Sequence, residues 1–225
     1  TGKKLAVESP IPLRVPEFDR SGSVFKVIKS HDMLLHFPYQ SFDYLIRFLM
    51  ESAYDPKVEE IKLTQYRVAE NSEVINALVT AARNGKKVTV YVELKARFDE
   101  ENNIFTSEQM QKAGIHVIYG VPGLKVHAKV ALILRRSIGG TNMEKSFAFL
   151  STGNFNEKTA KVYSDIGLFT YNTQIITELN CLFEILEGKD VPPVFNTLLV
   201  AQYNMLDVLK SMIDQEIGKR DIVHY

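Results

Sequence analysis

The sequence predicts an α/β fold in which helices flank a mixed, largely parallel sheet. Three observations lead to this prediction. Stretches rich in β-branched residues, such as KVTVYV at 87–92, recur along the chain as strands do. Amphipathic segments that end at glycine separate these stretches, as helices do. The 225 residues are 45% apolar and 24% charged, which is typical of a globular protein with a sizeable core.

The expected elements follow one another along the chain. Residues 1–24 contain three prolines and no lasting periodicity, so we expect an extended connector there. A short strand and a turn at Pro38 come next, and a helix begins at Ser41 or Asp43. Strand patterns then occupy 58–68, 87–98, 115–120, 123–132, 145–152 and 165–172, and helix patterns occupy 71–86, 102–114 and 173–188. The Val191-Pro192-Pro193 stretch predicts a boundary. Residues 191–225 would then contain a linker and the start of a second unit.

The composition excludes several classes of protein. Lys+Arg and Asp+Glu are both 27, so the chain has no overall basic charge for nucleic acid, and we expect no nucleic-acid partner. One cysteine, Cys181, excludes an internal disulfide and a cysteine-rich zinc site. His36, His116 and His224 match no metal-ligand spacing. We see no signal peptide or membrane-spanning run, and we therefore expect a cytoplasmic protein.

Two cationic side chains interrupt the apolar stretch GLKVHAKVAL at 123–132. His127 and Lys129 stand two residues apart, so on a strand both would point to the same face. Two such side chains together favour an anionic ligand. A histidine with satisfied hydrogen bonds beside a solvated lysine at a strand edge is the alternative, and these residues alone do not decide between them.

A second motif favours the anion. The stretch LSTGNFNEKTAKVYSD places Gly153 and Asn154 after an expected strand, where glycine permits close backbone approach and asparagine offers an amide donor. An H-x-K strand followed by such a turn resembles the half-site of the phospholipase D superfamily. There the histidine attacks phosphorus while the lysine and asparagine hold the phosphoryl oxygens. The sequence departs from that pattern at Leu134, where the superfamily usually has aspartate.

A closer resemblance accounts for this departure. The stretches LLHFPYQSFD, IKLTQYRV, VELKARFDE, GLKVHAK and STGNFNEKTAKVYSDIGLFT resemble the catalytic region of bacterial polyphosphate kinases, in the same order, over about residues 10–225. The resemblance implies a phospholipase D-like domain over 25–190 and a truncated second catalytic domain within 191–225. It also implies reversible transfer of the ATP γ-phosphate to inorganic polyphosphate. A phospholipase D-like phosphodiesterase and a non-enzymatic phosphate-binding module are the alternatives.

The resemblance also assigns roles to single residues. His127 would be phosphorylated, and a neutral imidazole is a competent nucleophile at cellular pH. Lys129 and Asn154 would stabilise phosphoryl charge. Tyr163 would contact ATP, although a tyrosine beside a strand is more often a core residue. Asp165 could orient a histidine ring.

Two arginines match the magnesium site of the family. Arg67 and Arg97 have no lone pair with which to coordinate Mg²⁺, so we expect them to clamp Mg-bound phosphate. Surface ion pairs are their alternative role.

The resemblance further implies a larger assembly. The family enzymes use a second histidine-bearing half-domain, are oligomeric, and in some cases associate peripherally with the inner membrane. We expect both ends of this sequence to be cuts in a longer protein, and the piece to be incomplete as an enzyme.

Overall fold

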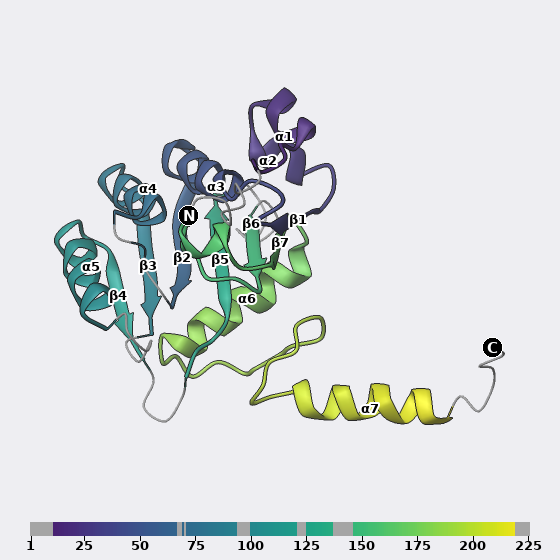
Figure 1. Cartoon of the computed structure of the whole chain (residues 1–225). Helices are drawn as coiled ribbons and strands as arrows, with labels where there is room; N and C mark the ends of the chain where they lie inside the picture. Colours follow the sequence, from purple (N-terminus) through teal and green to yellow (C-terminus); the bar gives the residue numbers. More distant parts are fainter. Residues whose placement is uncertain are drawn as a thin grey trace, which may run out of the picture.

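A computed structural model of the chain describes residues 11–66, 69, 71–93, 100–120, 125–136 and 146–218. Within them, strands form one seven-stranded sheet in the order β1-β7-β6-β5-β2-β3-β4 (Figure 1). The strands are β1 Met33–Phe37, β2 Val58–Gln65, β3 Lys87–Val92, β4 His116–Tyr119, β5 Lys129–Arg135, β6 Phe147–Ser151 and β7 Asp165–Thr170.

The expected α/β fold with a mixed sheet is confirmed, but the expectation of mostly parallel pairing is wrong. Only the β2–β3 and β3–β4 pairings are parallel, and the other four of the six are antiparallel. The difference lies in the connections. Helices α4 (Glu73–Arg83) and α5 (Glu100–Lys112) return the chain between parallel strands. Among the described residues, no α-helix lies between β5 and β6 or between β6 and β7, and these strands pair with one another antiparallel.

Helices cover both faces of the sheet (Figure 1). Helices α3 (Asp43–Tyr54) and α4 pack on one face, with α1 (Pro16–Ser21) and α2 (Val24–Ile28) beside them. Helix α6 (Thr173–Leu186) packs on the other face. β5 is buried along its whole length. Ala131 and Ile133 belong to the core on the side of α3 and α4, and Leu132 and Leu134 belong to the core on the side of α6.

The extended connector expected over residues 1–24 is wrong for its described second half. Pro16 begins a helix, which is possible because the first turn of a helix needs no backbone donor at that position. Phe18 on this helix is fully buried and lies against Tyr44 and Phe169. The segment is therefore part of the core.

The chain that leaves α6 is held by one buried carboxylate. Glu178 Oε1 accepts hydrogen bonds from the backbone N–H groups of Asn196 (3.0 Å) and Thr197 (2.9 Å), and Oε2 accepts from Leu198 (2.7 Å). Burial would raise the pKa of Glu178, but the bonds from Leu198, Asn196 and Thr197, with one from Gln174, lower it.

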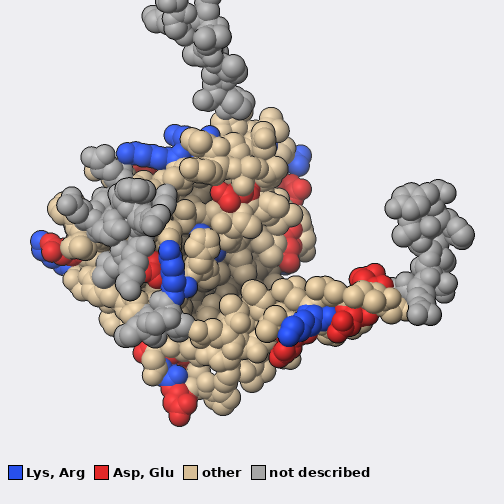
Figure 2. Space-filling model, turned by 60° about the horizontal axis from the view of Figure 1, so that its bottom comes forward, with Lys and Arg blue, Asp and Glu red and all other residues tan. Residues whose placement is uncertain are grey.

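Beyond this anchor, α7 (Met205–Gly218) extends away from the sheet and has no buried residue (Figure 1). None of the described helices is long and apolar enough to cross a membrane. Figure 2 shows charged side chains scattered in small groups on the face it presents, without one broad basic surface.

Candidate functional site

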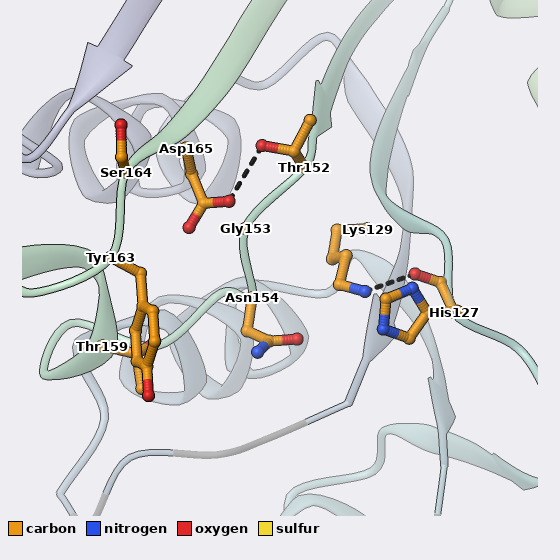
Figure 3. A pocket seen from close by; sticks show the side chains of 9 residues that line it. All are labelled: His127, Lys129, Thr152, Gly153, Asn154, Thr159, Tyr163, Ser164 and Asp165. Atoms are coloured by element: carbon orange, nitrogen blue, oxygen red, sulfur yellow. Dashed lines mark hydrogen bonds between the residues drawn. The ribbon is translucent and has the colours of Figure 1, made fainter.

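A cavity of about 320 Å³ opens where β5 begins, β6 ends and β7 begins (Figure 3). It gathers four of the six site residues predicted from the sequence, namely His127, Lys129, Asn154 and Tyr163. The other two, Arg67 and Arg97, lie outside the described residues. The remaining lining residues are Thr152, Gly153, Thr159, Ser164 and Asp165.

His127 lies just outside the strand that was expected to contain it. β5 begins at Lys129, where its pairing with Ser151 of β6 also begins. His127 is consequently exposed, whereas Lys129 is buried with 5% of its surface accessible. The two residues still meet, because Lys129 Nζ donates a hydrogen bond of 2.5 Å to the His127 carbonyl oxygen (Figure 3).

Burial, together with nearby charges, sets the protonation of the two side chains. Loss of solvation, with the positive charges of Lys129 and Lys125, lowers the pKa of His127 below its usual 6.5. Burial lowers the pKa of Lys129 to about 8, although the charge of Asp165 opposes this change. At neutral pH, therefore, His127 has a free ring lone pair while Lys129 keeps its proton and charge.

Tyr66, directly after β2, was not predicted as part of the site. Its ring meets the His127 ring edge-on at a centroid distance of 5.3 Å and an interplanar angle of 74°. The ammonium groups of Lys125 and Lys129 lie 5.4 and 5.3 Å from its centroid, within cation–π range. The stretch QYRV contains this tyrosine, but the spacing rules for strands do not indicate which neighbouring strand its ring would reach.

The side-chain amide of Asn154 is another polar group that lines the cavity. Its Oδ1 is buried and has no hydrogen-bond partner among the described residues. Figure 3 shows the amide between His127 and Tyr163, which lie on opposite sides of the cavity. The oxygen and nitrogen of a side-chain amide exchange by a half-turn, so Asn154 can offer a donor as well as an acceptor here.

Gly153 and Asp165 fit each other closely. A Cβ atom at position 153 would lie 2.5 Å from Asp165 Cγ and Oδ2, so only glycine leaves room for this carboxylate. Asp165 Oδ1 accepts a hydrogen bond of 2.9 Å from Thr152 Oγ1 (Figure 3). Within the described residues it does not accept one from a histidine ring, so the orienting role expected for Asp165 is not seen.

Tyr163 stands at the mouth of the cavity. It follows the 3₁₀ turn η3 (Thr159–Lys161), and 61% of its surface is exposed. A core role for this tyrosine is therefore excluded, and its ring is accessible to a ligand.

Comparisons with known proteins identify the family of the chain. Residues 23–192 match the family described as Polyphosphate kinase C-terminal domain 1. The polyphosphate kinase of Staphylococcus saprophyticus is 46% identical over 195 residues, covering 87% of this chain and 27% of that protein. The polyphosphate kinase of Escherichia coli K12 is 42% identical over 220 residues, covering 96% and 32%.

Solved structures agree as well. The polyphosphate kinase of Porphyromonas gingivalis superimposes with a TM-score of 0.86 at 50% identity, over 97% of this chain and 36% of that one. Nuc from Salmonella typhimurium, a phospholipase D family member, matches 70% of this chain and 92% of that one with a TM-score of 0.53 at 14% identity, which is a likeness of fold alone. The chain spans about a third of the length of its polyphosphate kinase relatives.

The phospholipase D-like fold is thus confirmed. The position where that superfamily usually has aspartate, Leu134, is only 7% exposed and belongs to the apolar cluster beneath α6. With a matching family over most of its length and close relatives that share its fold, this chain belongs to the polyphosphate kinase family.

Proposed function

We propose that this chain carries the phosphate-accepting site of an enzyme that transfers the ATP γ-phosphate reversibly to inorganic polyphosphate. The observation that supports this most is the gathering of His127, Lys129 and Asn154 around one cavity. The relatives named polyphosphate kinase support the reaction.

The proposed chemistry has two displacement steps. A neutral ring nitrogen of His127 attacks the γ-phosphorus of ATP, an N–P bond forms, and the bond to the β-phosphate oxygen breaks to release ADP. A terminal oxygen of polyphosphate then attacks the same phosphorus. The N–P bond breaks, the imidazole regains its lone pair, and the polyphosphate is one unit longer.

The neighbouring side chains would stabilise the transferring group. The ammonium of Lys129 would offset negative charge on the equatorial oxygens. Asn154 would donate to one of these oxygens from its amide, whose second polar atom is buried. Tyr163, exposed at the mouth, would stack on the adenine of ATP.

Magnesium is proposed on the family likeness, as the cation that accompanies ATP. Mg²⁺ bound to the phosphates of ATP would supply charge neutralisation there. Across the described residues no group of three or more His, Cys, Asp or Glu side chains lies together as a cation site. Arg67 and Arg97 would clamp the same phosphates through their guanidinium groups.

The wider context is proposed on the family likeness. Residues 25–190 would be the first catalytic domain, and residues 191–225 the linker and start of a second. The full-length enzyme would be a cytoplasmic homo-oligomer, in some cases associated peripherally with the inner membrane.

Transfer of labelled γ-phosphate from Mg·ATP to the protein tests this function. We expect acid-labile, alkali-stable label in the wild-type protein and none in His127→Ala. His116→Ala is the matched control, since His116 is an exposed histidine on β4, away from the cavity. Label that survives in His127→Ala would contradict the assignment. The assay is run on this chain and on the full-length enzyme, because binding of ATP can require parts of the enzyme that this chain does not contain.

A phosphodiesterase remains the alternative, and the buried apolar setting of Leu134 disfavours it. Hydrolysis of a generic phosphodiester by wild type but not by His127→Ala would support that alternative.

A further inference from the structure

The segment that carries His127 leaves the sheet before it reaches the cavity. Leu63 and Ala131 are the last paired residues of β2 and β5, and Lys129 and Ser151 are the last of β5 and β6. Residues 125–128 are therefore outside the strand ladder. A segment without ladder bonds is mobile unless other groups hold its backbone.

The side chain of Thr64 replaces the missing ladder bonds. Its Oγ1 donates to the Ala128 carbonyl oxygen at 2.7 Å and accepts from the Val130 N–H at 3.0 Å. Thr64 itself is 3% exposed on β2. One hydroxyl thus satisfies a backbone acceptor on the residue after His127 and a donor two residues further on.

The side chain of Glu93 holds the other side of His127. Its Oε2 accepts from the Val126 N–H at 3.2 Å, and Glu93 is 4% exposed. The fully buried Asn103 amide donates to the carbonyl oxygens of both Tyr66 and Glu93, at 3.1 and 3.2 Å. The ends of β2 and β3 are thereby tied together beneath the His127 segment.

We infer that Thr64 and Glu93 are positioning residues for His127, which hold its backbone from both sides so that an exposed imidazole keeps one orientation toward the cavity. This inference rests on the proposed role of His127. Neither residue lines the cavity. Their effect is geometric, since misplacing a reacting group by about 1 Å can cost about a hundredfold in rate.

Thr64→Val tests the inference, because valine keeps the shape of threonine and removes the hydroxyl. Thr64→Ser is the matched control that keeps the hydroxyl. Both are made in the full-length enzyme. We expect Thr64→Val to slow His127 labelling by Mg·ATP by about 10- to 100-fold with little change in the KM for ATP. Thr64→Ser should stay within a few-fold of wild type. Equal rates in Thr64→Val and wild type, or equally slow rates in both variants, would overturn the inference.

Hydrogen exchange of residues 125–130 provides a readout that does not depend on phosphorylation. We expect slow exchange in wild type and Thr64→Ser, and faster exchange in Thr64→Val. If wild type acquires no label, the proposed function fails while exchange still decides whether the segment is held. If Thr64→Val does not fold, hydrogen exchange in the wild-type protein tests the inference by itself. Fast exchange over 125–130 would show that the segment is not held and would overturn the inference. Glu93→Leu removes the acceptor of the Val126 N–H and should slow labelling in the same way, and a wild-type rate in this variant would remove Glu93 from the inference.

Discussion

Replacing Gly153 by alanine should destabilise the domain through the Asp165 side chain. The new Cβ would lie 2.5 Å from Asp165 Cγ and Oδ2 and 2.8 Å from its Cβ, so the carboxylate would have to turn away. It would then lose its 2.9 Å hydrogen bond from Thr152 Oγ1. Gly153 does not have a left-handed backbone, so the added methyl group is the whole perturbation.

The expected magnitude follows from these two contacts. A hydrogen bond to a charged group contributes about 1.5–3 kcal/mol, and overpacking costs about 1–3 kcal/mol. The Thr152–Asp165 bond is accessible to solvent, which weakens it. We therefore expect the free energy of unfolding to fall by about 1–2 kcal/mol, and the Tm by about 2–8 °C for a domain of this size.

Thermal unfolding at pH 7 measures this change. Gly120→Ala is the matched control, because the nearest atom to its added Cβ would be Tyr91 Oη at an ordinary 3.7 Å. The same Gly153→Ala change in a Thr152→Val background should cost less, since the hydrogen bond is already absent. Equal Tm values for Gly153→Ala and Gly120→Ala would refute the reasoning.

Three further outcomes follow from the described contacts. The rate of His127 phosphorylation, measured by rapid quench across pH, should rise with pH with its midpoint below 6.5, as His127 loses its proton. It should fall again around pH 8, as Lys129 loses its own proton. A flat profile over this range would exclude both roles. Gly167→Ala would bring a Cβ within 2.6 Å of the buried Phe149 ring and should lower the free energy of unfolding in urea by about 1–3 kcal/mol. Glu178→Gln should cost about 1–3 kcal/mol at pH 7. Because folding lowers the pKa of Glu178, the charged carboxylate stabilises the folded state above the usual value of 4.5. This contribution is lost as the pH falls through the lowered pKa. The free energies of unfolding of wild type and variant should therefore converge in acid.

The sequence predicted the alternation of strands and helices because each element has its own periodicity. The helix over Glu73–Arg83 and the strand over Lys87–Val92 were both expected from such patterns. Pairing direction could not be predicted in this way. Whether β5 runs parallel or antiparallel to β2 depends on contacts between strands that are 64 residues or more apart in the chain, as for Thr64 and Ala128.

The site was predicted in part for a similar reason. His127, Lys129 and Asn154 lie in motifs whose local spacing is informative, and the cavity contains all three. Tyr66 contacts His127, and Thr64 contacts Ala128, from the region of β2. The spacing of residues within their own stretch does not indicate these contacts with a distant part of the chain. The prediction for Arg67 and Arg97 stays a prediction, since both lie outside the described residues.

The place of β5 in the sheet has a consequence for how the protein unfolds. In the order β1-β7-β6-β5-β2-β3-β4 it is the fourth of seven strands, with three on either side. Local opening of a sheet begins at its edges, where strands have one neighbour, and reaches the middle only when the whole unit opens. His127 stands two residues before the first residue of this middle strand. Local fraying of the edge strands β1 and β4 can therefore leave β5, to which the His127 segment is joined, in place. Opening of β5 itself requires nearly the full free energy of global unfolding.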